Sequence, residues 1–177
     1  MKHYLVQAGI LLFIFILIIN PGGISIRAID DFNTVKQELP SIYKADSVWV
    51  DSIMTTLSLE EKIAQSLMIA AYSNKGPEHI AEINELIESY NIGGLIFFQG
   101  GPLRQAAMIN SFQSRAKTPL LIAMDAEWGP GMRLDSTMSY PKQMMLGAIS
   151  DESLIYQMGY DIGEQLKRLG VHVNFAP

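Results

Sequence analysis

The chain has 177 residues, of which 49% are hydrophobic, and its formal net charge is -5. This length and apolar content suffice for the core of one domain, and the acidic balance excludes the basic surface that nucleic-acid binding needs. The chain has no cysteine, which excludes disulfides and thiolate metal sites.

The first residues have the layout of an export signal. Residues 5–19 form an almost unbroken apolar run, preceded by Lys2 and followed by the breaker Asn20-Pro21-Gly22-Gly23. Because the run is shorter than the roughly 20 residues of a spanning helix, we expect residues 1–28 to be a cleaved signal peptide ending near Ala28, with an uncleaved membrane anchor as the alternative. The protein would then be exported to the periplasm or the exterior, and it would touch a membrane only through this segment if uncleaved.

A polar leader is expected over residues 29–57, followed by the folded domain over 58–177. Ser58-Leu59-Glu60-Glu61 has the spacing of a capping box, which predicts a short helix from Ser58. The next apolar stretch, Gln65 to Tyr72, fits either a helix or a strand, and we favour a strand ending near Tyr72.

Strands and helices then alternate along the chain. The predicted order is helix 78–90 closed by Gly93-Gly94, strand 95–98, helix 103–116, strand 120–124, helix 151–169 stopped by Gly170, and strand 171–176. The helix over 151–169 places one set of apolar residues on a single face, namely Leu154, Ile155, Met158, Ile162, Leu166 and Leu169. Such alternation predicts an α/β fold with a parallel sheet and right-handed crossovers. A complete eight-stranded barrel needs about 250 residues, so we expect about the first half of a TIM-type (β/α) barrel.

Two carboxylates, Asp125 and Glu127, follow the buried strand 120–124. Ligand sites lie at the carboxyl ends of parallel strands. One interpretation is structural: Asp125 caps a loop or helix, and Arg133 forms a local ion pair with Asp125 or with Asp135. The other is functional: Asp125 accepts hydrogen bonds from the hydroxyls of a sugar while Arg133 donates to neighbouring oxygens. Spacing allows both, and Trp128 fits half-buried packing better than a stacking platform.

Other chemistries are poorly supported. Asp125 and Glu127 are a weak candidate for the acid/base and nucleophile pair of a glycosidase, because the direction of the chain beyond the strand is uncertain. His3 lies in the export segment, His79 near a helix start, and His172 in an apolar strand where a hydrogen-bonded core histidine is expected. Since the histidines do not cluster and the glycines lack a nucleotide fingerprint, we expect no metal and no cofactor.

Several ordered motifs carry a family resemblance. They are Leu59-Glu60-Glu61-Lys62-Ile63-Ala64-Gln65, Ile92-Gly93-Gly94-Leu95-Ile96-Phe97-Phe98, Asp125-Ala126-Glu127 with Arg133, Tyr140-Pro141, and the stretch from Leu169 to Pro177. Together they resemble the N-terminal domain of glycoside hydrolase family 3, over residues 58–177. Trp128 departs from the pattern, since the family often has Gly-Gly after the glutamate.

The resemblance implies a (β/α) barrel domain that hydrolyses β-linked sugars with retention. The motifs look most like the β-N-acetylhexosaminidase branch, which acts on fragments of peptidoglycan or chitin. On that basis Asp125 and Arg133 bind the terminal sugar, while the nucleophile and the acid/base are expected downstream of Pro177, so that the chain alone would be inactive. A fragment of a family 3 β-glucosidase and a non-catalytic sugar-binding module are the alternatives.

Overall fold

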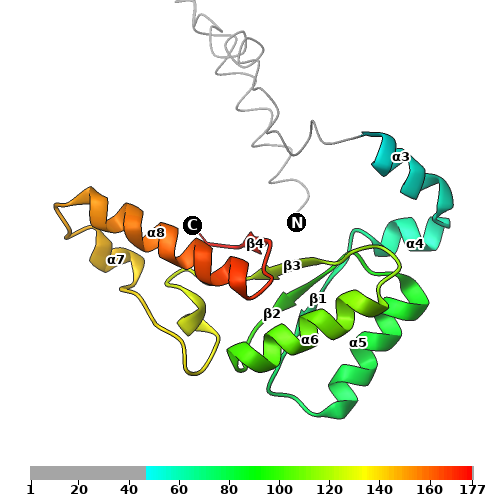
Figure 1. Ribbon diagram of the computed structural model, residues 1–177, viewed down its shortest axis with the longest axis horizontal. Coiled ribbons are helices and arrows are strands. Elements are labelled where there is room, and N and C mark those ends of the chain that lie inside the picture. The colour runs from blue at the N-terminus through cyan, green and yellow to red at the C-terminus, as the bar shows by residue number, and fades with distance from the viewer. Residues whose placement is uncertain (1–46, 177) are drawn as a thin grey trace, which may run out of the picture. The chain divides into compact units, whose positions relative to one another are not determined.

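Helices and parallel strands alternate through residues 47–176, the part of the chain that the computed structural model describes (Figure 1). The elements are α3 (Ser47–Thr56), α4 (Leu59–Ala64), β1 (Met68–Ala71), α5 (Pro77–Tyr90), β2 (Gly94–Phe97), α6 (Pro102–Arg115), β3 (Leu121–Met124), η2 (Pro130–Met132), α7 (Gln143–Leu146), α8 (Glu152–Arg168) and β4 (Val173–Asn174). The predicted strands and long helices are therefore confirmed, each within a few residues of its expected bounds.

Three short helices were not predicted. Helix α3 lies in the segment interpreted as a polar leader, and η2 and α7 lie in the connection between β3 and α8. The predicted signal peptide over residues 1–28 and its end at Ala28 lie outside the described residues. Within residues 47–176, no helix combines the length and apolar character needed to cross a membrane.

The four strands form one parallel sheet in the order β1-β2-β3-β4. Ala71 pairs with Phe97 and Phe97 with Met124, and Met124 pairs with Asn174 of β4. The carboxyl ends of all four strands therefore lie along one edge of the sheet, so that the loops after them are neighbours.

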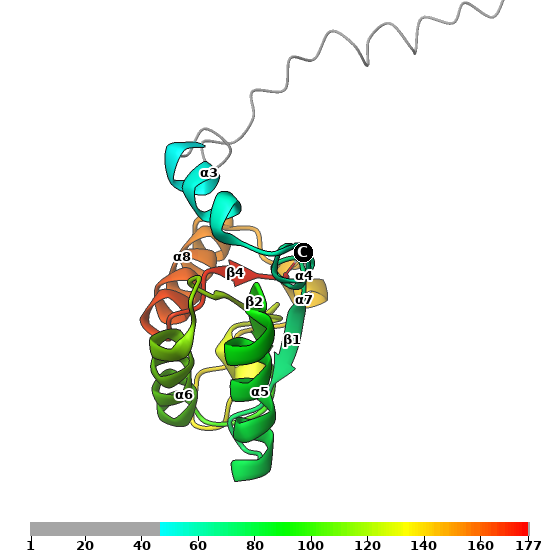
Figure 2. The ribbon, with the colours of Figure 1, turned by 90° about the vertical axis from the view of Figure 1, so that its right-hand side faces the viewer.

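The core lies between the sheet and the helices on one face. Figures 1 and 2 show α5 and α6 side by side against the strands, and α8 lies beyond α6, next to β4. Alternate strand residues point into this core, as the period of two requires. The buried apolar side chains include Leu95, Phe97, Ile122 and Met124 from the strands and Ile83, Ile87, Ile109, Phe112, Ile162 and Leu166 from the helices.

The predicted capping box at the start of α4 is present. The Ser58 hydroxyl accepts a hydrogen bond from the Glu61 amide, and the Glu61 carboxylate accepts one from the Ser58 amide. A hydrogen bond from Lys117 lowers the pKa of Glu61, and the Ser58 amide lowers it further. This pairing satisfies two amides that a helix start would otherwise leave free.

The end of α5 differs from the expectation for Gly93-Gly94. Asn91 ends the helix in the left-handed conformation, with φ of 55°. Gly93 is needed for a different reason: a Cβ there would lie 1.9 Å from the carbonyl oxygen of Gln65. The glycine allows two backbone segments to approach each other at the amino end of the sheet.

Helix α8 begins at the Asp151 cap and ends before Gly170, which has φ of 77°. Ile162 and Leu166 of the predicted apolar face are buried. Leu154, which was assigned to the same face, is instead exposed. The periodicity correctly predicted the helix and the apolar face of its later turns. The first turn of α8 extends past the elements that bury those later turns.

Candidate functional site

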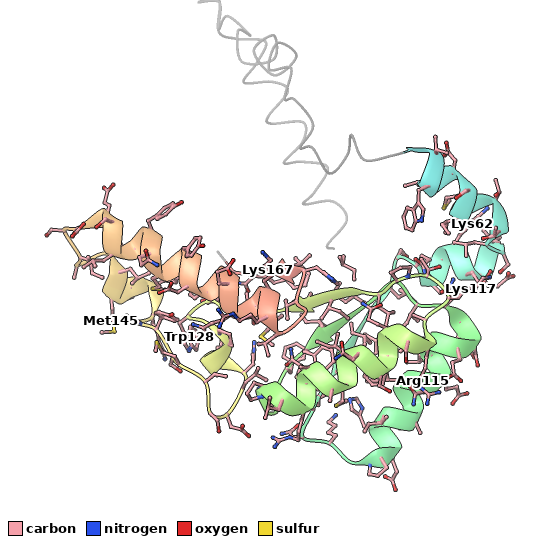
Figure 3. All side chains as sticks on the ribbon, in the orientation of Figure 1. Lys62, Arg115, Lys117, Trp128, Met145 and Lys167 are labelled. Atoms are coloured by element: carbon pink, nitrogen blue, oxygen red, sulfur yellow. The ribbon has the colours of Figure 1, made fainter. Side chains whose placement is uncertain are left out.

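Asp125 lies directly after β3, at the edge of the sheet where the strands end. The chain then turns through Gly129, whose φ of 88° favours glycine, and enters η2. Arg133 follows η2, and this turn brings it back to Asp125. Figure 3 shows Trp128 of the same loop at the opposite end of the sheet from Lys62 and Lys117, two residues that precede strands.

The predicted pair of Asp125 and Arg133 is formed. The Arg133 Nε donates to the backbone oxygen of Asp125 at 3.0 Å, and Nη2 donates to the carboxylate oxygen Oδ2. Both side chains are largely covered, with 16% of Arg133 and 26% of Asp125 exposed. Asp135, the other carboxylate near this arginine in sequence, pairs with Arg104 instead.

The second carboxylate oxygen of Asp125 is the most informative atom of the site. Oδ1 is buried and has no hydrogen-bond partner among the described residues. An ionised carboxylate accepts several hydrogen bonds, and leaving a buried acceptor without one costs about 1–3 kcal/mol. The structural interpretation, a local ion pair, accounts for Oδ2 alone and leaves Oδ1 without a donor among the described residues.

An aromatic stack lies beneath the arginine. The Arg133 guanidinium carbon lies 4.9 Å from the centre of the Phe98 ring, and Phe98 stacks on Tyr72 with 5.6 Å between ring centres. Lys75 also lies over the Tyr72 ring, with 3.9 Å from Nζ to the ring centre. Phe98 follows β2 and Tyr72 follows β1, so the ends of three adjacent strands contribute to holding Arg133.

Side chains from two later elements fasten the loop between β3 and η2. Asn174 of β4 exchanges two hydrogen bonds with the backbone of Ala126, and Gln143 of α7 donates to the backbone oxygen of Glu127 at 2.9 Å. No role in the site was predicted for Phe98, Tyr72 or Asn174. Their position at strand ends was the available signal, but the spacing does not indicate which side chains at neighbouring strand ends meet.

Glu127 and Trp128 sit beside Asp125 without joining its ion pair. Glu127 lines a cavity of about 220 Å³ together with Gln143, Asn174 and residues of α8. Trp128 is half-buried, as expected, and Lys142 Nζ lies 5.1 Å from the centre of its ring. Glu127 is therefore a loop carboxylate adjacent to the site.

The two histidines of the described residues hold backbone amides. His79 Nε2 accepts from the Tyr72 amide at 3.1 Å, and burial and Lys75 lower the pKa of His79 despite the neighbouring Glu82. His172 Nδ1 accepts from the Ile122 amide at 3.0 Å, but its side chain is exposed, not buried in the core as expected. Within residues 47–176, no group of three or more His, Cys, Asp or Glu side chains is placed to hold a metal.

The profile described as "Glycosyl hydrolase family 3 N terminal domain" matches residues 58–177, which is more than half of the chain. The chain belongs to this family. The match includes every strand of the sheet and both partners of the Asp125–Arg133 pair. The matched range also contains the ordered motifs that carried the resemblance.

Two curated relatives differ in the activities their names state. A "Beta-hexosaminidase A" of Pseudoalteromonas piscicida is 35% identical over 54% of this chain and 18% of its own length. A "Beta-N-acetylglucosaminidase/beta-glucosidase" of Cellulomonas fimi is 24% identical over 73% of this chain and 22% of its own length. The chain thus spans about a fifth of the length of these relatives.

Solved structures support the same fold. A structure titled "Beta-glucoside phosphorylase BglX bound to 2FGlc" matches with a TM-score of 0.65 and 22% identity, over 73% of this chain and 23% of that chain. At this identity the likeness establishes the arrangement of strands and helices. The fold does not determine which sugar is bound, because that depends on the residues of the site.

Proposed function

We propose that this chain supplies the terminal-sugar binding part of a retaining β-N-acetylhexosaminidase that acts on peptidoglycan or chitin fragments. The four strands belong to a (β/α) barrel, and Asp125 and Arg133 bind the terminal sugar at its carboxyl-end face. The observation that carries the proposal is the Asp125 carboxylate, of which one oxygen is held by Arg133 and the other is buried without a partner among residues 47–176.

The geometry suits a polyhydroxylated ligand. A sugar ring presents adjacent hydroxyls, which donate to a carboxylate and accept from a guanidinium. Because Arg133 already binds Oδ2 and rests on Phe98, the two charged groups are ordered before the sugar arrives. Such pre-organisation reduces the entropy that binding would otherwise cost. We expect the nucleophile and the acid/base to lie outside residues 58–177, the range that matches the family. Hydrolysis would then require more of the parent protein than this chain.

A β-glucosidase is the second candidate, because the Cellulomonas fimi relative carries both activities in its name. The 2-substituent separates the two, since a hexosaminidase site must accommodate an acetamide where a glucosidase meets a hydroxyl. A sugar-binding module without hydrolysis is the third candidate.

We also propose that residues 1–28 direct export. Mass spectrometry of the N-terminus of the exported protein tests this, and an intact Met1 would show that no cleavage occurs.

Sugar binding by the 177-residue chain tests the main proposal. The chain has two tryptophans, so a Trp49→Phe background leaves Trp128, in the site loop, as the fluorescent reporter. Methyl β-N-acetylglucosaminide should quench or shift its emission with a dissociation constant in roughly the millimolar range, and Asp125→Asn should weaken this by about tenfold through loss of a charged acceptor.

Methyl β-glucoside is the matched ligand, and equal or tighter binding of it would favour the β-glucosidase. Hydrolysis provides an independent arm. We expect no turnover of 4-nitrophenyl N-acetyl-β-glucosaminide by this chain, and robust turnover abolished by Asp125→Ala would show that the assignment of the catalytic groups to other residues is wrong.

A further inference from the structure

Asn174 is joined to the site loop in a way that only an amide side chain allows. Its Oδ1 accepts from the Ala126 amide at 2.9 Å, and its Nδ2 donates to the Ala126 carbonyl oxygen at 3.3 Å. Ala126 is fully buried and lies between the two carboxylates, Asp125 and Glu127. Both polar groups of its backbone are thus paired with one side chain, and the Ala126 oxygen also accepts from the Gly129 amide at 3.1 Å.

This contact replaces the strand ladder at the point where the ladder stops. The last paired residues of β3 and β4 are Met124 and Asn174, and the Phe175 amide donates to the Met124 oxygen at 2.9 Å. Beyond Met124 the chain turns away towards Gly129, so no backbone of β4 is in register with Ala126. The Asn174 side chain extends the pairing by one more residue.

The site loop is consequently anchored at Asp125 and at the residue that follows it. Arg133 holds the backbone oxygen and one carboxylate oxygen of Asp125 itself. Asn174 holds the next residue and, through it, fixes the direction of the chain that carries Asp125. A free carboxylate turns about its side-chain bonds, whereas a carboxylate on a loop held at both ends keeps one orientation.

We propose that Asn174 is a positioning residue for the sugar site, acting through Ala126 to orient the Asp125 carboxylate. The inference rests on the proposed sugar-binding function and deepens it, because it assigns a role at the same site to a residue that lies 48 positions further along the chain. No hydrogen bond among the described residues joins Asn174 to Asp125 or Arg133. Asn174 instead sets the geometry in which Asp125 Oδ1 meets a ligand hydroxyl.

The same strand offers a matched control. His172 also uses a side-chain nitrogen to accept from a β3 amide, that of Ile122, at 3.0 Å. His172 lies two residues earlier, where the backbone ladder between the strands is still present, since the His172 amide donates to the Ile122 oxygen at 2.8 Å. Replacing it removes a comparable contact away from Asp125.

The experiment compares Asn174→Ala and Asn174→Asp with His172→Ala in the 177-residue chain. Asn174→Ala removes both hydrogen bonds, while Asn174→Asp keeps an acceptor for the Ala126 amide but places a carboxylate against its carbonyl. We expect both Asn174 variants to weaken binding of methyl β-N-acetylglucosaminide by roughly tenfold. His172→Ala should keep the affinity within about twofold. Its thermal stability should nevertheless fall about as much as that of the Asn174 variants.

Hydrogen exchange of the Ala126 amide gives a second readout that does not depend on sugar. Its protection should be lost in Asn174→Ala and retained in His172→Ala. An unchanged affinity in folded Asn174→Ala, or an equal loss in His172→Ala, overturns the positioning role. If the wild-type chain binds no sugar, the proposed function fails, and the exchange result alone then decides whether Asn174 fixes this loop: retained protection in Asn174→Ala overturns it.

Discussion

The guanidinium of Arg133 combines a fork of two hydrogen bonds with a flat face that packs on a ring, which an ammonium group cannot do. Its Nε donates to the Asp125 backbone oxygen while Nη2 donates to the carboxylate, and its flat face rests on the ring of Phe98. A lysine has one compact charge on a flexible stem and lacks this fixed fork. The shape of the side chain therefore matters as much as its charge.

Arg133→Lys should weaken sugar binding although the net charge is unchanged. One charge-assisted hydrogen bond contributes about 1.5–3 kcal/mol, so its loss corresponds to an affinity roughly 10- to 100-fold lower. Titration of methyl β-N-acetylglucosaminide with Trp128 fluorescence measures the change.

Arg104 provides the control for that substitution. Its Nε donates to the Ser73 backbone oxygen at 3.2 Å and its Nη2 to Asp135 at 3.0 Å, which is the same pattern on an exposed surface. Arg104→Lys should leave the affinity unchanged. A similar loss in both variants would indicate a general effect on the loop between β3 and α7, not a contribution of Arg133 to the ligand.

His79 makes stability depend on pH in a stated direction. Burial, with Lys75 nearby, lowers the pKa of His79 below its ordinary value of 6.5, and its Nε2 must stay unprotonated to accept from Tyr72. The unfolded chain therefore takes up a proton at this position before the folded chain does. Its contribution to stability is complete above about pH 6.5 and is lost as the pH falls below that value.

The prediction is that His79→Gln flattens this dependence, since a glutamine oxygen can accept from the Tyr72 amide without titrating. Chemical denaturation at about pH 8 and about pH 5.5 should show a smaller difference in unfolding free energy for the variant than for the wild-type chain. An identical difference in both proteins would show that His79 does not carry the effect. The other two histidines are the same in both chains and cancel.

At the scale of elements, Asn91 joins a helix end to the entry of a strand. It ends α5 with φ of 55°, and its side-chain amide exchanges hydrogen bonds with Thr118, to the hydroxyl at 3.2 Å and from the backbone amide at 3.3 Å. Alanine fits neither the left-handed backbone nor the two bonds. Glycine fits the backbone but not the bonds, so the pair of variants separates the two contributions.

We expect Asn91→Gly to lower the unfolding free energy by about 1–3 kcal/mol, because the buried Thr118 groups lose their partners. Asn91→Ala should cost roughly 1–2 kcal/mol more, which is the penalty for a Cβ in the left-handed region. Urea denaturation gives both values. Equal losses in the two variants would show that the backbone conformation at Asn91 contributes nothing.

The helices and strands show what one sequence can and cannot predict. Periodicity located α5 and α8 because buried residues such as Ile83 and Ile162 recur at helical spacing, and short apolar runs located the strands. The Asp125–Arg133 pair was predictable because a short loop joins its members. The Asn174 contact was not, since it depends on where the pairing of β3 with β4 stops and on the direction of the loop after Met124. The apolar stripe on α8 overstated the burial of Leu154, because the helix sequence does not show how far the neighbouring elements extend.

At the scale of the whole described region, the two faces of the sheet differ in cover. Leu95, Phe97, Ile122 and Met124 on one face are buried beneath helices. On the other face Ala70 is exposed, Ile96 is half-buried, and Leu121 is 47% exposed. Strands β1 and β4 also end the sheet within residues 47–176, and open edges of this kind invite pairing with another chain.

These features predict that the purified chain associates with copies of itself through the less covered face. Burying a leucine contributes about 1.5–3 kcal/mol, so Leu121→Lys should weaken association by roughly tenfold or more. Leu103→Lys is the control, because Leu103 is 86% exposed but lies on α6, on the helical side. Sedimentation velocity over a range of concentrations measures both. A wild-type chain that stays a folded monomer throughout would contradict the prediction and favour a self-contained sugar-binding module.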